Sequence, residues 1–207
     1  MRKYLLGLTG FVLAFGILGI SFLKSASIRY AYAASPSPTP STKTQSVSVE
    51  YFLPYPGKIM PDSPTWTLKA MRDNVWYKIT INPLKRAEIA LLLSDKRLQM
   101  SKSLFENKKP DIGFSTLTKG EKYLEIAFAD VNEAGKRGMN TSEFITKLAT
   151  ASLKHREVLD QILEIAPEDA KPGIIKIGDY PKNIYKETSS ILNSKGLSTP
   201  KSPFIGD

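Results

Sequence analysis

The sequence predicts an all-α protein, a bundle of four to five helices with a long antiparallel hairpin, preceded by an N-terminal signal or anchor segment. Three observations support this fold class. Apolar residues recur at helical spacing over most of the chain after residue 61. Polar capping residues followed by proline mark successive helix starts. No region of the sequence is rich in strand-forming residues.

The first 33 residues have the features of an export segment. Arg2 and Lys3 precede an uncharged run of 20 residues, Tyr4 to Leu23. As a helix this run spans about 30 Å, the thickness of the bilayer hydrocarbon, which favours a membrane anchor. The small residues of Ala31-Tyr32-Ala33 instead favour a signal peptide cleaved after Ala33. In both cases the basic residues before the run place the rest of the chain outside the cytoplasmic membrane.

A linker and pre-domain segment, residues 34–60, is expected next. Proline alternates with Ser or Thr from Ser35 to Ser41, which is typical of an extended spacer without a core of its own. The helical domain is expected over residues 61–194. Residues 195–207 are expected to form a flexible tail.

The first helix of the domain is expected to begin at Pro64, after the capping residues Asp62 and Ser63, and to end near Ile79. Its apolar positions share one stripe, which we expect to face the core. These positions are Leu68, Met71, Val75 and Ile79.

The next two helices are expected to form the antiparallel hairpin. One runs from Pro83 to about Glu106 and the other from about Asp111 to Lys136. On both helices large and small residues alternate along the inward stripe, and small residues let helix axes approach closely. The inward positions are Leu84, Ala87, Leu91, Ser94, Leu98, Ser101 and Phe105 on the first helix, and Leu117, Gly120, Leu124, Ala127, Val131 and Ala134 on the second.

Two more helices complete the predicted bundle. Asn140 and Glu143 resemble a capping box that opens a fourth helix, which continues to about Ile165. A shorter fifth helix is expected from Ile184 to Leu192, after Pro181.

The formal charge of +9 is concentrated in the first half of the chain. Between Lys43 and Lys109 there are 12 basic and 6 acidic residues, whereas residues 110–207 hold 13 basic and 14 acidic ones. For an exported protein this excess points to anionic lipid headgroups or envelope polymers rather than to nucleic acid. The interpretation we favour for this excess is a solvated basic face with no dedicated partner.

The residues that usually carry chemistry are scarce. The absence of cysteine excludes disulfides, thiolate metal sites and cysteine nucleophiles. The single histidine, His155, lies on the apolar stripe of the fourth helix, and no metal-ligand partner stands three or four residues away. We therefore expect it to form an interhelical hydrogen bond. The acidic residues are expected on solvated helix faces, among them Glu121, Glu125, Glu157, Asp160 and Glu164.

These observations predict no enzymatic activity, no cofactor, and no catalytic, cofactor-binding or metal-binding residue. An aromatic-rich entry to the domain lies close to several basic residues, which would suit sugar binding or a membrane interface. The interpretation we favour is that these rings close one end of the bundle. The aromatic residues are Tyr51, Phe52, Tyr55, Trp66, Trp76 and Tyr77, and the basic ones are Lys58, Lys69, Arg72 and Lys78.

Several short motifs together resemble an uncharacterised family of exported bacterial and archaeal helical proteins, catalogued only as a domain of unknown function. The resemblance covers about residues 50–175 and implies an extracytoplasmic helical domain, with no activity, ligand or catalytic residue attached. The motifs are Tyr51-Phe-Leu-Pro-Tyr-Pro-Gly57, Pro61-Asp-Ser-Pro64, Leu68-Lys69, Arg72-Asp73, Pro83-x-Lys85-x-Ala87-Glu88, Asp95-Lys96-Arg97-Leu98, Lys154-His155-x-x-Val158-Leu159 and Pro167-Glu-Asp-Ala-Lys171.

The leading hypothesis from the sequence is an exported, non-catalytic domain of the cell envelope. It would be structural, or bind an anionic or protein partner, and would also contact the membrane through residues 4–23 if these are not cleaved. The alternative hypothesis is an extracytoplasmic metal or stress sensor, or a chaperone that uses the helical hairpin to hold a metal or unfolded chains.

Overall fold

The structure, a computed structural model, describes residues 48–204. These residues form helices without any strand, which confirms the all-α prediction. The predicted signal or anchor segment and the proline-rich spacer lie outside the described residues. The helices are α2 (Trp66–Ile79), α3 (Pro83–Glu106), α4 (Pro110–Lys136), α5 (Ser142–Ile165), α6 (Lys171–Ile177) and α7 (Asp179–Ser194).

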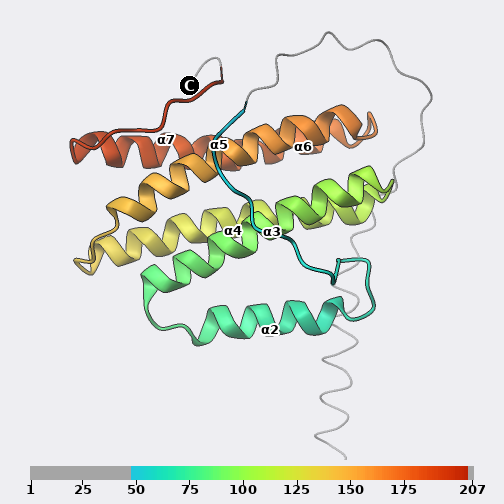
Figure 1. The fold of residues 1–207 in the computed structure, drawn as a ribbon, viewed down its shortest axis with the longest axis horizontal. Coiled ribbons are helices and arrows are strands. Elements are labelled where there is room, and N and C mark those ends of the chain that lie inside the picture. The colour runs from blue at the N-terminus through green and yellow to red at the C-terminus, as the bar shows by residue number, and fades with distance from the viewer. Residues whose placement is uncertain (1–47, 205–207) are drawn as a thin grey trace, which may run out of the picture. The chain divides into compact units, whose positions relative to one another are not determined.

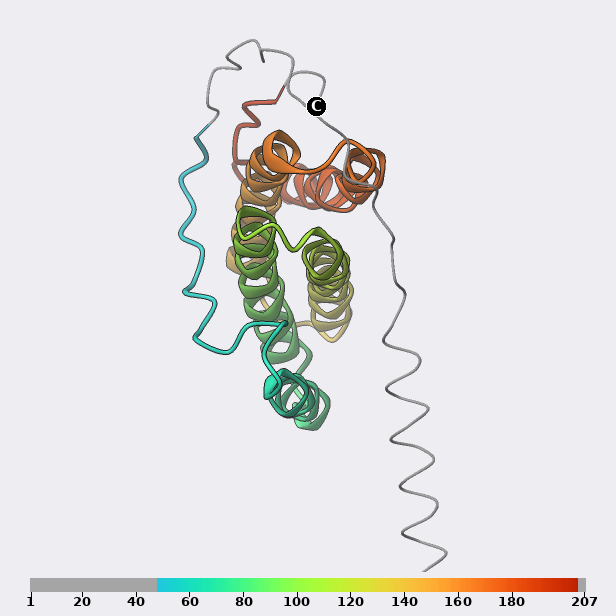
Figure 2. The ribbon, with the colours of Figure 1, turned by 90° about the vertical axis from the view of Figure 1, so that its right-hand side faces the viewer.

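The helices are stacked in layers around the α3–α4 hairpin (Figure 1). Helices α3 and α4 pack against each other more extensively than any other pair in the described part of the chain. Helices α5 and α7 cover one side of the hairpin, and the short α6 connects them. Helix α2 lies on the opposite side (Figure 2), where its backbone comes close to that of α3 alone among the described helices.

The hairpin forms as the sequence predicts. The side chain of Asn82 accepts a hydrogen bond from the backbone N–H of Lys85, and Pro83 is the first residue of α3. The inward stripes of both helices are buried, except for the partly exposed Leu84. Phe105 lies near the turn of the hairpin and contacts the backbone at Gly113.

Two serines of α3 tie the hairpin together at the glycines of α4. The hydroxyl of Ser94 donates to the carbonyl oxygen of Gly120, and that of Ser101 donates to the carbonyl oxygen of Gly113, both at 2.8 Å. A Cβ atom on Gly120 would lie 3.2 Å from the Cβ atom of Arg97. The small residues that we predicted as gaps therefore allow both the close approach and the hydrogen bonds.

The buried apolar side chains form two clusters along the bundle. One contains Leu91, Leu124, Leu148 and Leu192, which come from α3, α4, α5 and α7. The other lies nearer the turn of the hairpin and is continued by α6; it includes Leu98, Phe105, Leu117, Ile162 and Ile174.

The C-terminal part of the bundle differs from the prediction in its details. Helix α6 is absent from the prediction; there Gly173 packs so closely on the Phe114 ring that a Cβ atom would lie 2.7 Å from it. Helix α7 begins before and ends after the predicted limits, Ile184 to Leu192. The hydroxyl of Tyr185 in α7 donates a hydrogen bond to the carbonyl oxygen of Pro200, which lies after the helix. This bond ties residues of the predicted tail to the bundle.

The orientation of α2 is the main correction to the predicted fold. Its apolar stripe, which the sequence analysis directed at the core, faces away from it: Leu68, Met71, Val75 and Ile79 are each at least half exposed. Asp73 is buried instead, and Trp66 and Tyr77 are partly buried. The reason is that α2 attaches to the bundle through polar and aromatic contacts, described below, which apolar periodicity does not reveal.

Within residues 48–204, no helix is sufficiently long and apolar to span a lipid bilayer. The apolar run from Tyr4 to Leu23 lies outside this range.

Candidate functional site

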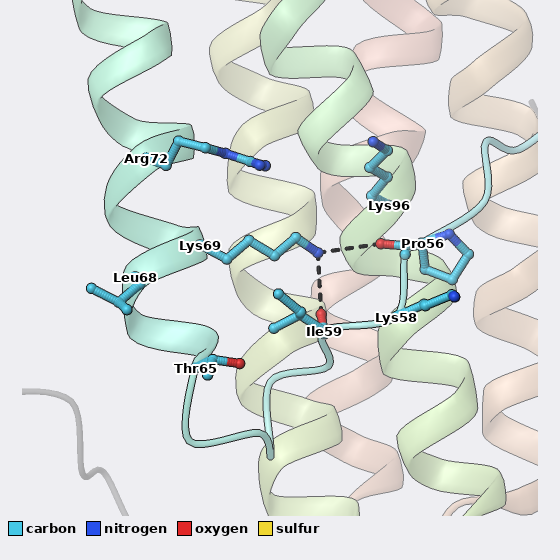
Figure 3. A pocket seen from close by; sticks show the side chains of 9 residues that line it. Pro56, Lys58, Ile59, Thr65, Leu68, Lys69, Arg72 and Lys96 are labelled. Carbon is cyan, nitrogen blue, oxygen red and sulfur yellow. Dashed lines mark hydrogen bonds between the residues drawn. The ribbon is translucent and has the colours of Figure 1, made fainter.

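A basic cavity lies between α2, α3 and the turn that leads into α2 (Figure 3). Its volume is about 550 Å³. Four of its lining residues are cationic and none is acidic: Lys58 from the turn, Lys69 and Arg72 from α2, and Lys96 from α3. We refer to this cavity as the basic pocket. These four cations belong to the excess of basic residues that the sequence shows before residue 110.

Lys69 fixes the shape of the basic pocket. Its side chain extends from α2 to the turn, where the ammonium group donates hydrogen bonds to the carbonyl oxygens of Pro56 at 3.3 Å and Ile59 at 3.2 Å (Figure 3). Gly57 between them has φ +98°, a conformation that favours glycine, and this lets the turn fold around the ammonium group. Burial lowers the pKa of Lys69, and Lys96 acts in the same direction.

Arg72 lies at the rim of the basic pocket and is bonded to the carboxylate next to it in sequence. Its Nε and Nη2 atoms donate to Oδ1 of Asp73 at 3.1 and 2.6 Å. The Asp73 side chain is buried, whereas that of Arg72 is 71% exposed. Solvent therefore reaches the guanidinium group but scarcely reaches its carboxylate partner, so that the rim presents positive charge.

A buried arginine lies behind the pocket. The guanidinium carbon of Arg97 is 4.4 Å from the ring centre of Tyr123 and 5.9 Å from that of Trp66, which also lies 5.0 Å from the Lys69 ammonium. Such ring faces stabilise cations that are removed from water. Burial lowers the pKa of Arg97 and, together with the Arg97 charge, that of Lys119. The region thus holds a buried positive charge at Arg97, partly offset by the buried carboxylate of Asp73.

This arrangement suits an anionic group. A phosphate or carboxylate in the basic pocket would meet several cationic side chains and would neutralise charges that now repel one another. The pocket is open to solvent and has apolar walls at Leu68 and Ile59, so that the apolar part of a ligand could also be accommodated. Lys96 was not among the basic residues that we grouped from the sequence, because α3 brings it to the pocket from outside the aromatic-rich entry.

His155 lies at the centre of a separate, fully buried cluster. Its Nδ1 atom is 2.8 Å from Oε1 of Glu121 on α4, and its Nε2 atom is 3.0 Å from Oδ1 of Asp95 on α3. The predicted interhelical hydrogen bond is therefore confirmed, and His155 forms two such bonds, one to α4 and one to α3. Burial disfavours the imidazolium, but the charges of Glu121 and Asp95 and their hydrogen bonds outweigh it and raise the pKa of His155 to about 10. At neutral pH both ring nitrogens donate to carboxylates.

The segment before α2 closes over this cluster. The hydroxyl of Tyr51 donates to Oδ2 of Asp95 at 2.8 Å, and the backbone N–H of Val49 donates to Oε2 of Glu157 at 2.7 Å. Burial and the Asp95 carboxylate raise the pKa of Tyr51 well above its usual range. Residues 48–57, which the sequence assigned to the linker and pre-domain segment, thus run alongside the bundle (Figure 2) and bond to it through buried carboxylates.

Two carboxylates lie elsewhere than predicted. Glu121 and Glu157 are buried rather than on a solvated face, because each has a buried partner: His155 for the first, and the Val49 amide for the second. The sequence contains a signal for the burial of Glu121. Asp95 and Glu121 each follow directly a small residue of the hairpin stripe, so that they border the seam on which His155 faces them.

The aromatic-rich entry is divided between two surfaces. Tyr51 and Trp66 are partly buried and contact the bundle, as does Tyr77, whose hydroxyl donates to Oδ2 of Asp130 at 2.8 Å. The other three rings are exposed, Phe52 by 86%, Tyr55 by 69% and Trp76 by 44%. The entry is therefore not one aromatic cap on the end of the bundle.

Residues 58–169 match the family catalogued as Domain of unknown function (DUF5667). The chain belongs to this family. The match confirms the resemblance found in the sequence, and it contains all four cations of the basic pocket and the whole Asp95–His155–Glu121 cluster. No curated protein and no solved structure matches the chain.

Proposed function

We propose that this protein is an exported, non-catalytic domain of the cell envelope that binds an anionic partner in the basic pocket. The observation that carries the proposal is the pocket lining, four cationic side chains from three segments with no carboxylate among them. The export part rests on the sequence: the basic residues and the apolar run that precede the domain.

The chemistry of the pocket favours phosphate-bearing partners. Arginine and lysine side chains bind phosphate oxygens through charge-assisted hydrogen bonds. In an exported protein, polymers and lipids of the envelope are the most abundant carriers of such groups. A charge-balanced surface would not concentrate them, whereas clustered positive charge does.

A non-catalytic role agrees with the environment of the only imidazole in the chain. Both nitrogens of His155 bond to carboxylates and the ring is fully buried, so it is not available as a base for a bound substrate. The basic pocket itself supplies charge, but Lys69 is committed to two carbonyl oxygens of the turn. A pocket that supplies positive charge, with Lys69 held by the turn, suits the binding and positioning of a ligand better than proton transfer.

The test measures binding of a soluble phosphate polymer, poly(glycerol phosphate), to the full chain in detergent, with dextran as the neutral control. We expect binding that weakens with salt. Lys96→Gln should raise the Kd about tenfold, equal to about 1.4 kcal/mol. The matched control is Lys122→Gln, on the exposed face of α4, which removes the same charge outside the pocket.

Two results would contradict the proposal. The first is an absence of binding by the unaltered chain. The second is an equal loss for Lys96→Gln and Lys122→Gln, since that would show attraction to net charge alone. Far-ultraviolet circular dichroism of each variant checks that the fold is retained.

A further inference from the structure

Helix α2 has its two faces reversed relative to an ordinary bundle helix. The side toward α3 carries the buried Asp73 and the ring of Tyr77, whose hydroxyl bonds to Asp130. The side toward solvent carries the apolar residues. We refer to these as the outer face of α2: Leu68, Met71, Val75, Trp76 and Ile79, exposed by 66, 59, 50, 44 and 68%.

The outer face forms one stripe and continues past the end of the helix. Leu68, Met71, Val75 and Ile79 are spaced by three or four residues, which places them on the same side of α2, and Trp76 lies next to Val75 at the edge of this stripe. Ile81, just after the helix, is 85% exposed. Contiguous exposed apolar surface of this kind marks an interaction site in soluble domains. The backbone of α2 comes close to α3 alone among the described helices, and Tyr77, which bonds to Asp130 of α4, lies on the other side of α2. No described helix therefore covers the stripe.

The charges around the outer face restrict what can cover it. Between residues 58 and 85 there are five basic side chains and two acidic ones, Asp62 and Asp73. Both acids are already paired, Asp62 with Lys109 at 2.5 Å and Asp73 with Arg72 at 2.6 Å. Lys78 and Arg72 are exposed on the same helix. A second copy placed symmetrically on this face would bring like charges together, which disfavours self-association.

An apolar stripe flanked by lysine and arginine, with an exposed tryptophan, is the pattern of a helix that lies in the interface of a lipid bilayer. We propose that the outer face of α2 docks on an anionic membrane surface, with Trp76 and its apolar neighbours entering the interface. The inference rests on the proposed function, of which it names the partner: the phosphate in the basic pocket would be that of a lipid headgroup. Leu68 belongs both to the pocket lining and to the outer face, so that one surface can serve both contacts.

The length of the chain permits this contact. The apolar run ends at Leu23, and 24 residues separate it from Ser48, the first described residue. At about 3.4 Å per residue, such a segment spans at most about 80 Å. The described chain then runs beside the bundle as far as α2 (Figure 2). A domain held by residues 4–23 could therefore bring α2 back to the bilayer.

The two tryptophans allow the test, since they are the only ones in the chain and have different surroundings: the Trp66 ring lies against Arg97 of α3, whereas Trp76 is 44% exposed. The full chain is reconstituted in lipid nanodiscs, one copy per disc, with lipids brominated in the acyl chain as quenchers. Trp66→Phe leaves Trp76 as the single reporter on the outer face. Trp76→Phe leaves Trp66 as the matched reporter on the inner face.

In discs that contain anionic lipid we expect blue-shifted and strongly quenched emission from Trp76, and unquenched emission from Trp66. Discs of zwitterionic lipid alone should leave Trp76 largely unquenched. Lys78→Gln should lower the ratio of docked to undocked domain about fivefold, since one cation near an anionic surface is worth about 1 kcal/mol.

A pair of variants separates apolar insertion from charge. Val75→Glu and Asn74→Glu add the same charge to exposed neighbouring positions of α2, but only Val75 belongs to the outer face. We expect Val75→Glu to abolish the quenching of Trp76 and Asn74→Glu to retain part of it. Circular dichroism verifies that both variants remain helical, and equal losses in the two would overturn the insertion.

The remaining outcomes overturn the inference in distinguishable ways. Unquenched Trp76 in anionic discs rejects membrane docking and leaves a second copy or an unfolded client chain as the occupant of the face. Equal quenching in anionic and zwitterionic discs rejects the role of charge. In either case the chain can still bind poly(glycerol phosphate) in a way that Lys96→Gln weakens. That result would show that the proposed function stands without the membrane.

Discussion

Nε2 of His155 on α5 lies 3.0 Å from Oδ1 of Asp95 on α3, across 60 residues of sequence. Together with the bond from Nδ1 to Glu121 on α4, this joins three helices at a single imidazole. The cluster contains one cation and two carboxylates, and one oxygen of Glu121 is buried without a hydrogen-bond partner among the described residues. The contribution of this cluster to the free energy of unfolding therefore depends strongly on the positive charge of the histidine.

We predict that His155→Leu lowers the free energy of unfolding by about 3–5 kcal/mol, because it leaves two buried carboxylates without their cation. Urea titration of the full chain in detergent measures the change. A charge-free variant that adds Asp95→Asn and Glu121→Gln to His155→Leu should recover part of the loss. Unchanged stability of His155→Leu would contradict the ion-paired description of the cluster.

The stability contributed by His155 should depend on pH in a defined direction. Its pKa is raised from 6.5 to about 10 in the folded chain, so the folded state binds the proton more tightly than the unfolded state. The contribution is then fully present below about pH 6.5 and is lost as the pH rises through 10.

The measurement is the stability difference between the unaltered chain and the charge-free variant, followed by urea titration between pH 6 and 10.5. We expect this difference to shrink steadily as the pH rises. The variant lacks the titrating groups of the cluster, so that the lysines and tyrosines that do not contact it cancel between the two proteins; Tyr51, which donates to Asp95, is the exception. A difference independent of pH would show that the histidine is neutral in the folded state.

The hairpin seam provides a prediction about packing. Leu98 is fully buried, and Leu98→Ala should cost about 2–5 kcal/mol through the cavity that it leaves. Lys102, one turn along α3, would be a poor surface control because its ammonium group donates to Oε1 of Gln161 at 2.8 Å. Lys122→Ala should instead change stability by no more than about 0.5 kcal/mol. Equal urea midpoints for Leu98→Ala and Lys122→Ala would mean that the seam is misassigned.

Two glycines of α4 form a matched pair. An added Cβ atom at Gly120 would lie 3.2 Å from Cβ of Arg97, whereas at Gly135 the nearest atom would be the Thr141 hydroxyl at 3.8 Å. Alanine favours a helix over glycine by about 1 kcal/mol at each position, but at Gly120 overpacking between two helices costs about 1–3 kcal/mol. Thermal unfolding should therefore show Gly120→Ala below the unaltered chain and Gly135→Ala at or above it. The same shift for both would contradict close contact at Gly120.

The sequence predicted the hairpin well because its two stripes are apolar or small and face each other. Periodicity identifies the buried side of a helix when burial is achieved by apolar residues, as it is at Leu98 and Leu124. The same reasoning failed for α2. There, the side toward the bundle is held by a buried aspartate and a tyrosine hydroxyl, and the apolar side faces solvent.

The candidate site was only partly predictable for a related reason. Composition located the positive excess in the first half of the chain, and Lys58, Lys69 and Arg72 were grouped from their proximity in sequence. Lys96 joins them through the packing of α3 beside α2, which no local pattern encodes. The partners of His155 were likewise hidden, because Asp95 and Glu121 lie 60 and 34 residues away.

The attachment of α2 to the bundle should depend on Tyr77. Its hydroxyl donates to Asp130, which Arg86 also holds, while burial and the Asp130 hydrogen bond raise its pKa to about 12. Tyr77→Phe removes one hydrogen bond, worth about 1 kcal/mol. This bond links α2 to α4, and the backbone of α2 otherwise comes close to α3 alone among the described helices. Its loss should therefore speed amide hydrogen exchange in α2 about fivefold and leave α4 and α5 unchanged. Tyr55→Phe, at an exposed ring, is the control. Exchange that accelerates equally throughout the bundle would show that α2 opens only when the whole domain unfolds.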